Sequence, residues 1–328
     1  MKEKLLIACD VGRHTSKAVL NYKGKTYISM FRTKVMEIEK LGLEIQPASY
    51  YVKLFGKQYL VGDMVSEDYS LFDLDKTSLH QQIATYTCIA DLLQKAHINP
   101  QQYDIRLATN IPINMYKNAD SKLKYKQFIE NQGNISITVN HKTCNFNLTD
   151  VTIAFEGMGV VYEQNPTPGT VTNVVDIGGL NATLCTFTGI QPNFDSMTVS
   201  NLGINMLKGK IGKALNEHYG IAVSPNDLEQ ILQSGCLTHK GRVNAESKDL
   251  IKKIKRDHFM QIIQFAQSRG YTFIGQVNFC GGGSLTLQEF IKEEFPDSIV
   301  INPQFANVRS YYKILEVKYH AKTNKVHN

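Results

Sequence analysis

Hydrophobic residues recur along the chain in short runs that end at glycine-containing turns. Residues 4–9 form an apolar run, and a second run at 17–20 follows a tight polar turn at Asp10–Ser16. Short apolar runs bounded by turn residues predict buried strands. The arrangement returns in the second half, where TVTNVVDIGG at 170–179 precedes TLCTF at 183–187. We interpret this echo as an internal duplication of a strand–turn–strand unit.

Between these runs, the pattern predicts alternating strands and helices. Residues 78–97 carry apolar side chains at helical spacing, with Ser78 as N-cap and Pro100 beyond the end. Further helices are predicted at 121–130, 202–218, 247–269, from about 285, and in the tail. Further strands are predicted at 25–31, 50–61 with a hairpin turn at Gly56–Lys57, 105–112 and 134–155, and the segment 272–284 is predicted as a strand that runs into a triple-glycine turn. This alternation is typical of an α/β protein.

The length of the chain and one linker predict two domains. A single hydrophobic core rarely grows beyond about 250–300 residues, and this chain has 328. The best linker candidate is Gln164–Gly169, where two prolines and a glycine stop the flanking elements.

Composition and charge narrow the class of protein. The chain is 42% hydrophobic and 20% charged, and its net charge of +6 is spread without a dense Lys/Arg tail. We therefore expect no direct binding of nucleic acid. The six cysteines include no CxxC pair, which is typical of buried thiols in a reducing cytosol. No window approaches the apolar length of a membrane span, so we expect a cytoplasmic protein without membrane contact.

The first glycine turn comprises residues 10–17 and suits an anionic ligand. Gly12 permits a tight backbone turn whose N–H groups bind phosphate oxygens. Asp10, at the end of the strand, is suited to holding the water shell of Mg²⁺, and Lys17 places a positive charge near phosphates. A simple hairpin is the alternative interpretation.

Two further glycine turns follow apolar strands. The second glycine turn, residues 176–181, begins with Asp176 and contains Gly178 and Gly179. The third glycine turn, residues 281–284, precedes a predicted helix whose N-terminus favours negative charge. No Walker A motif is present. The three glycine turns are informative as a set. The hairpins of the first and second turns are suited to clamping one triphosphate, and the third turn is suited to holding the nucleoside.

The order and spacing of these turns resemble those of the actin superfamily, and in particular the plasmid-segregation actins of the ParM/StbA group. The segments FEGMGVVYE at 155–163 and NPQFANVRSYYK at 302–313 resemble the corresponding segments of that group. The resemblance implies two ribonuclease-H-like α/β domains with inserted subdomains around a nucleotide cleft. Domain I would span 1–165, with an insert near 25–75, and would be completed by a helix near 305–320. Domain II would span 166–304, with an insert near 205–265.

The resemblance also implies roles for individual residues. Asp10 and Asp176 would hold Mg²⁺ through water, and Glu156 would orient the attacking water. Nucleotide contacts would come from Gly12, Arg13, His14, Thr15, Lys17, Gly178, Gly179, Leu180, Asn181, Gly281, Gly282, Gly283 and Ser284. The chain departs from the family where Arg13 replaces Ser or Thr, Leu180 and Asn181 replace two threonines, and Thr183 replaces an acid.

The resemblance implies a filament-forming ATPase with ATP and Mg²⁺ as cofactors. Its partners would be further copies of itself and a small DNA-binding adaptor on a plasmid centromere. A small-molecule kinase on the same fold and a nucleotide-regulated scaffold with little turnover are the alternatives, and the residues leave ATP and GTP both open.

Overall fold

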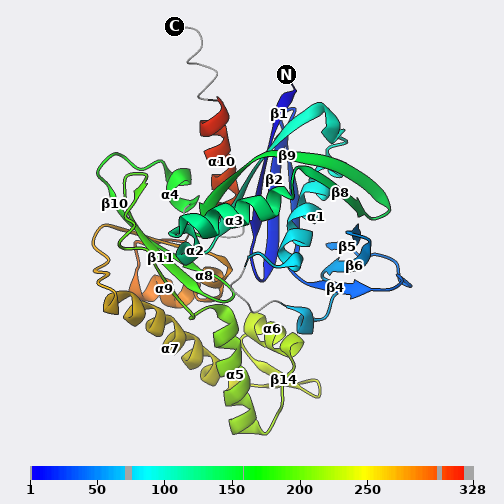
Figure 1. The fold of residues 1–328 in the computed structure, drawn as a ribbon. Coiled ribbons are helices and arrows are strands. Elements are labelled where there is room, and N and C mark those ends of the chain that lie inside the picture. The colour runs from blue at the N-terminus through cyan, green and yellow to red at the C-terminus, as the bar shows by residue number, and fades with distance from the viewer. Residues whose placement is uncertain (1, 71–75, 158, 301–304, 321–328) are drawn as a thin grey trace. The chain divides into compact units, whose positions relative to one another are not determined.

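The computed structural model divides into two units (Figure 1). Unit 1 contains the chain up to Glu163 together with the segment from Asn307, and unit 2 contains Gln164–Ala306. The residues that the structure describes are 2–70, 76–157, 159–300 and 305–320. The end of the expected first insert (71–75), Met158 of the connecting segment and 302–304 of the C-terminal motif lie outside them.

Unit 1 is built on a nine-stranded sheet. Its strands are β1 (Glu3–Val11), β2 (Thr15–Tyr22), β3 (Lys25–Arg32), β4 (Val35–Ile38), β5 (Ser49–Leu54), β6 (Lys57–Gly62), β7 (Tyr103–Ile111), β8 (Asn134–Val139) and β9 (Lys142–Phe155). Their order is β3-β2-β1-β7-β9-β8-β5-β6-β4. β1, β7 and β9 run parallel, so their carboxyl ends lie at one edge of the sheet. Ligands of α/β proteins bind at such an edge, which makes it the place to look for a site.

Helices cover this sheet and complete its core. The helices of unit 1 are α1 (Leu79–Lys95), α2 (Ile113–Tyr116), α3 (Ala119–Glu130), α4 (Gly159–Gln164) and α10 (Ala306–His320), with short 3₁₀ turns at Glu67–Tyr69 and Pro100–Gln102. α1 begins where the Ser78 side chain accepts the Gln81 N–H, and it buries Ile83 and Ile89 in the core. α10 packs on unit 1, where Tyr311 donates to the Phe155 carbonyl at 3.2 Å.

Unit 2 repeats the central arrangement of unit 1 on a smaller sheet. Its strands are β10 (Val171–Ile177), β11 (Ala182–Thr188), β12 (Gln191–Pro192), β13 (Thr198–Ser200), β16 (Gln276–Cys280) and β17 (Ile299–Val300). The order is β12-β11-β10-β16-β17, with β13 paired to β11. The antiparallel hairpin β10–β11 and the parallel strand β16 match β1, β2 and β7 of unit 1. This matching topology agrees with the sequence echo.

The remaining elements of unit 2 pack around that sheet. They are α5 (Ile204–Tyr219), α6 (Pro225–Ser234), α7 (Glu246–Ser268), α8 (Gly282–Thr286), α9 (Gln288–Glu294) and a separate hairpin of β14 (Leu237–His239) and β15 (Arg242–Asn244). Leu207 of α5 and Phe259 of α7 are fully buried against strand residues such as Phe279.

The structure confirms the predicted α/β class and corrects three local predictions. The helix predicted at 78–97 is α1. The hairpin turn in 50–61 lies at Phe55–Gly56, because both residues adopt positive φ and Leu54 pairs with Lys57. The first glycine turn is tighter than predicted, since Val11 and Ser16 are already paired strand residues. The strand predicted from 272 begins only at Gln276.

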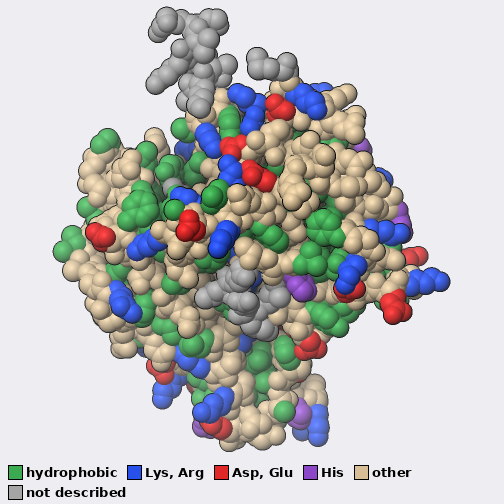
Figure 2. Space-filling view, in the orientation of Figure 1, with side chains coloured by type: hydrophobic (Ala, Val, Ile, Leu, Met, Phe, Trp, Pro, Cys, Tyr) green, Lys and Arg blue, Asp and Glu red, His purple; other side chains and the backbone are tan. Residues whose placement is uncertain are grey.

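The surface carries charges of both signs. On the face drawn in Figure 2, Lys and Arg side chains are interspersed with Asp and Glu side chains. None of the helices in the described ranges combines the length and apolarity that crossing a membrane requires.

Candidate functional site

The first glycine turn connects β1 to β2 at the carboxyl edge of the unit 1 sheet. Asp10 pairs with Lys17 across the hairpin, and the Gly12 N–H donates to the Thr15 carbonyl at 3.2 Å. A Cβ at Gly12 would lie 2.9 Å from that same oxygen. The turn therefore requires glycine at this position.

Asp10 is held by a neighbouring strand. The Asn110 side chain, near the end of β7, donates from Nδ2 to Asp10 Oδ1 at 3.0 Å. Burial raises the pKa of Asp10, and the charges of Lys17 and Lys76 oppose that rise. Asn110 is buried, and its Oδ1 has no hydrogen-bond partner within the described part of the chain. A buried acceptor of this kind beside a carboxylate suits a hydrated cation, because a metal-bound water donates hydrogen bonds.

Lys76 connects the first glycine turn to the candidate catalytic acid. Its side chain is 1% exposed, donates to the Val11 carbonyl at 2.6 Å and lies 3.4 Å from Glu156 Oε1. Burial lowers the pKa of Lys76, and the negative charge of Glu156 opposes that effect. A buried ammonium stays charged only where acids and acceptors compensate it. Lys76, Asp10 and Glu156 therefore form one electrostatic cluster in unit 1, which we call the acid–lysine cluster.

Glu156 follows the end of β9, and its backbone N–H donates to the Ile111 carbonyl at 3.3 Å. The parallel strands β1, β7 and β9 thus bring Asp10, Asn110 and Glu156 to one edge of the sheet. Sequence reasoning proposed Asp10 and Glu156 but missed Lys76 and Asn110. The only local signal for Lys76 is its position two residues before the N-cap of α1.

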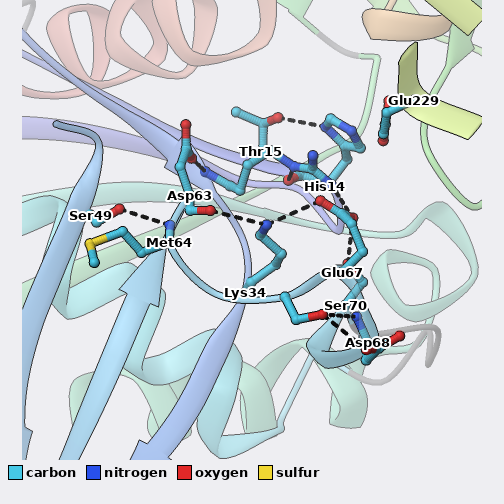
Figure 3. A network of polar contacts seen from close by, with 12 residues as sticks. His14, Thr15, Lys34, Ser49, Asp63, Met64, Glu67, Asp68, Ser70 and Glu229 are labelled. Atoms are coloured by element: carbon cyan, nitrogen blue, oxygen red, sulfur yellow. Dashed lines mark hydrogen bonds and ion pairs between the residues drawn. The ribbon is translucent and has the colours of Figure 1, made fainter. Parts of the chain in front are cut away.

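A second network fixes the backbone on the far side of the first glycine turn. The His14 carbonyl accepts from Arg32 Nε at 3.1 Å and from the Thr33 N–H at 3.0 Å, and the His14 ring contacts the Thr15 hydroxyl at 2.8 Å. Glu67 holds Arg32 at 2.7 Å and Lys34 at 3.0 Å. Figure 3 shows the Lys34 ammonium between Glu67 and Asp63, where it donates to the Glu67 carboxylate and to the Asp63 carbonyl.

These contacts belong to the segment that follows β3. Burial by itself would raise the pKa of Glu67, but Lys34 and Arg32 together lower it. Glu67 therefore stays ionised at neutral pH and keeps both cations in place. The network ties β3 and the 63–67 segment to the turn that carries His14.

The second glycine turn is shaped by backbone contacts. The Gly178 N–H donates to the Asn181 carbonyl at 2.8 Å. Three successive carbonyls of the turn accept hydrogen bonds from N–H groups at the start of α5. The Gly178 carbonyl accepts from Ile204 at 3.1 Å and the Gly179 carbonyl from Asn205 at 2.8 Å. The Leu180 carbonyl accepts from Gly203 at 3.2 Å. In a trans peptide the carbonyl and the next N–H point in opposite directions. The N–H groups that follow these carbonyls therefore point away from α5, which is the geometry of an anion-binding nest.

The third glycine turn lies beside the second because β10 and β16 are parallel neighbours, with Asp176 opposite Cys280. A Cβ at Gly281 would lie 2.2 Å from Asp176 Oδ1, and one at Gly283 would lie 2.4 Å from Ile177. Gly282 has open space at the same position. Gly281 also adopts φ of 81°, so this approach of backbone to Asp176 depends on glycine.

The third glycine turn differs from the prediction in one respect. Gly282 and Gly283 already belong to α8, whereas a helix was expected only from about 285. The Ser284 hydroxyl is buried and donates back to the Cys280 carbonyl. Its side chain therefore points into unit 2, and the open backbone at Gly282 is the accessible part of the turn.

The structure places the proposed site residues in two sets. The first glycine turn and Glu156 belong to unit 1, and the second and third glycine turns belong to unit 2. Within the described ranges, no group of three or more His, Cys, Asp or Glu side chains is arranged to bind a metal ion directly. A cation held through water by single carboxylates, as proposed for Asp10 and Asp176, needs no such group.

Comparison with known proteins gives one family model and several solved structures. Residues 8–159 match the model of the actin like proteins N terminal domain. The archaeal actin homologue Ta0583 shares 18% identity, covers 96% of this chain and 99% of its own, and has a TM-score of 0.79. None of the curated proteins searched matches this sequence.

Two filament structures are also similar. The Alp12 filament shares 29% identity, covers 97% of this chain and 99% of its own, and has a TM-score of 0.70. A 15-stranded ParM filament from Clostridium botulinum shares 18% identity, covers 95% of this chain and 99% of its own, and has a TM-score of 0.77.

Proposed function

Because this chain is an actin-like protein of the ParM and Alp kind, we propose that it is an ATP-dependent, filament-forming ATPase that segregates plasmid DNA. The observation that carries the proposal is the acid–lysine cluster beneath the first glycine turn. It combines a glycine hairpin suited to phosphate with an acid 3.4 Å from a buried ammonium. This set suits nucleotide hydrolysis, in which the protein mainly positions groups and neutralises charge.

Nucleotide contacts are proposed from both units. In unit 1 they are the backbone around Gly12 and the side chain of Lys17, and in unit 2 they are the N–H groups of the second glycine turn and the open backbone at Gly282. An ADP complex is known for Ta0583, which shares 16% identity in that structure. Mg²⁺, held through water by Asp10 and Asp176, would supply charge neutralisation at the phosphates.

The residues of the acid–lysine cluster and the neighbouring Asn110 have separate roles in the proposal. Glu156 accepts a hydrogen bond from the attacking water and so orients it toward the terminal phosphate. Lys76 holds the Glu156 carboxylate in place, because the two charged groups lie 3.4 Å apart. Asn110 orients the Asp10 carboxylate through its 3.0 Å hydrogen bond.

Assembly and partners follow from the relatives and from the sequence resemblance. The Alp12 and Clostridium botulinum ParM structures are filaments, and we propose that this chain likewise assembles with copies of itself in the cytoplasm. ATP binding favours assembly and hydrolysis loosens the filament. A small DNA-binding adaptor links the filament to a plasmid centromere.

Light scattering and pelleting of the purified protein, with released phosphate followed in the same cuvette, test this function. We expect rapid scattering on adding Mg-ATP, followed by phosphate release, and no assembly without nucleotide. Absence of assembly with ATP, GTP or ADP across salt concentrations would contradict the filament function. Turnover that requires an added sugar or other small acceptor would instead identify a kinase.

A further inference from the structure

Two hydroxyl groups in the interior of unit 1 lack a hydrogen-bond partner. They belong to Tyr125 of α3 and Thr109 of β7, and both residues are fully buried. Neither Tyr125 Oη nor Thr109 Oγ1 is hydrogen-bonded to any group of residues 2–70, 76–157, 159–300 and 305–320. Because a buried hydroxyl without a partner is costly, such groups are usually satisfied by an internal water molecule.

The two hydroxyls lie close to each other. Burial raises the pKa of Tyr125, and the neighbouring Thr109 hydroxyl opposes that rise. The two groups interact in this way without forming a hydrogen bond that satisfies either of them. One water molecule can accept a hydrogen bond from Tyr125 and donate one to Thr109. Its second hydrogen then remains for a further acceptor.

The nearest candidate acceptor is Glu156, which lies beyond Thr109 along the sheet. Thr109 and Ile111 are alternate residues of β7, so their side chains point to the same face. The Glu156 N–H donates to the Ile111 carbonyl, which places the acid about 7 Å of strand beyond Thr109. The negative charge of Glu156 also contributes to the raised pKa of Tyr125. Such a spacing is too long for a direct hydrogen bond and suits a water-mediated one.

Glu156 and Tyr125 are both held by contacts with α1 and the residues that precede it. Lys76, two positions before the N-cap of α1, lies 3.4 Å from Glu156. The Tyr86 hydroxyl of α1 donates to the Ile129 carbonyl of α3 at 2.8 Å. Tyr125 and Ile129 are four residues apart and both fully buried, so they share the inner face of α3. The phenol therefore approaches the sheet on the side that α1 covers.

We propose that Tyr125 and Thr109 hold an internal water molecule that donates a hydrogen bond to the Glu156 carboxylate, so that Tyr125 is a positioning residue for the candidate catalytic acid. This inference rests on the proposed role of Glu156 and adds the group that supports it from inside unit 1. Lys76 lies beside Glu156 Oε1. A carboxylate has about four acceptor sites, which is enough for the ammonium, the internal water and the attacking water together.

The test measures kcat and KM for ATP by phosphate release, together with the melting temperature, in wild type, Tyr125→Phe and Thr109→Val. Both substitutions remove a hydroxyl and keep the shape of the side chain. Each should lower kcat about tenfold and change KM less than about twofold, because the carboxylate is placed less well while the nucleotide contacts stay. Thr109→Ser keeps the hydroxyl and should retain the wild-type kcat.

Tyr86→Phe is the matched control. Tyr86 is also a fully buried tyrosine where α1 meets α3, but its hydroxyl already has a partner in the Ile129 carbonyl. Its loss should lower the melting temperature and leave kcat unchanged. In the Glu156→Gln background, Tyr125→Phe should have no further effect on kcat, because it acts through the acid.

The outcomes separate this inference from the proposed function. A wild-type kcat in Tyr125→Phe and Thr109→Val would contradict the inference, and a loss of stability without a change in kcat would show that the hydroxyls serve only the fold. If wild type releases no phosphate, the proposed function fails, and a crystal structure of the protein decides the water site. Electron density for a water molecule in contact with both hydroxyls and the Glu156 carboxylate would support that site. A direct hydrogen bond between Tyr125 and Thr109 without water would overturn it.

Discussion

The first and second glycine turns close hairpins of the same topology, but different interactions hold them. In unit 1, charged and polar side chains surround the turn, with Lys76 bonded to Val11 and Asn110 to Asp10. In unit 2, backbone N–H groups at the start of α5 donate hydrogen bonds to three successive carbonyls of the turn. Two hairpins of the same topology can therefore differ in what surrounds them. One turn is surrounded by charged and polar side chains, and the other is held by backbone hydrogen bonds.

This difference leads to opposite expectations for mutations. Removing a charge from the acid–lysine cluster should lower turnover more than nucleotide affinity. Altering the fit between α5 and the second glycine turn should lower affinity and stability, because residues 178–180 of that turn contribute backbone groups to the proposed site.

The largest effect is expected for Lys76→Met. It removes the ammonium that lies 3.4 Å from Glu156 and leaves Asp10 and Glu156 without their buried partner. ATP turnover should fall about 100-fold, because Glu156 would lose the charged partner that holds its carboxylate in position to orient water. Steady-state phosphate release measures this, and Lys53→Met, at an exposed position of β5, is the control. Turnover near the wild-type rate in Lys76→Met would remove the central difference between the two turns.

The next effect is expected for Gly203→Ala in unit 2. A Cβ at Gly203 would lie 2.2 Å from the Leu180 carbonyl carbon and 2.4 Å from the Asn181 nitrogen. The start of α5 would have to move off the second glycine turn, so nucleotide affinity should fall about tenfold and the melting temperature should drop. Calorimetric titration with ADP and thermal unfolding measure both.

Gly209→Ala is the matched control for that substitution, because no atom lies within 4 Å of the added Cβ. Alanine in a helix interior is favoured over glycine by about 1 kcal/mol. This variant should therefore be slightly more stable than wild type, with unchanged affinity. Equal loss of affinity in both variants would show that α5 as a whole, and not its first turn, supports the nest.

A pH-dependent effect is expected from His258 of α7. Its Nδ1 lies 3.0 Å from Lys210 Nζ, which can only donate, so Nε2 carries the proton and donates to the Leu202 carbonyl at 3.2 Å. Leu202 immediately precedes Gly203, so His258 supports the loop that leads into α5. Burial, together with the charge of Lys210, lowers the pKa of His258 from 6.5 to about 4.

The sign of the pH effect follows from that lowered pKa. Between about pH 6.5 and about pH 4 the unfolded chain binds a proton at this residue and the folded chain does not. The contribution of His258 is therefore present above this window and lost as the pH falls through it, by up to about 3 kcal/mol. His258→Gln keeps a donor and an acceptor without titrating. Urea unfolding at about pH 7.5 and about pH 5 should show a smaller loss of stability in His258→Gln than in wild type.

The smallest effect is expected for Asp150→Asn, which lies far from either turn in sequence. Burial would raise the pKa of Asp150, but hydrogen bonds from Lys318, Tyr319 and Lys126 hold that pKa well below its usual value. The bonds from Lys318 and Tyr319 tie α10 to β9, and the bond from Lys126 ties α3 to β9. Losing the charge should cost about 1 kcal/mol at neutral pH. The difference from wild type should begin to shrink as the pH falls below the usual carboxyl pKa and should vanish only near the lowered pKa of the folded protein. A constant difference in urea unfolding down to low pH would contradict this origin.

The features predicted correctly from the sequence are those with a local cause. The first strand, β1, and the helix at 78–97 each follow from a continuous pattern of apolar residues and a capping or turn residue. The α/β class follows from the alternation of such segments. The three glycine turns were recognisable because each glycine follows an apolar strand.

The features that were missed depend on contacts between distant residues. Lys76 lies 65 positions from Val11, and Asn110 lies 100 positions from Asp10, so no motif connects them. The short helix α8 starts inside a run of glycines, although glycine is a poor helix former. Gly281 and Gly283 approach Ile177 so closely that neither position has room for a side chain. The roles assigned to individual site residues remain predictions.

The most direct test of the account compares phosphate release and light scattering for wild type and Glu156→Gln after addition of Mg-ATP. Glutamine keeps the size of the side chain and removes the carboxylate that Lys76 contacts. We predict that Glu156→Gln assembles with ATP as wild type does, that its phosphate release falls about 100-fold, and that its scattering does not decline. Phosphate release at the wild-type rate in Glu156→Gln would contradict the assignment of the chemistry to unit 1.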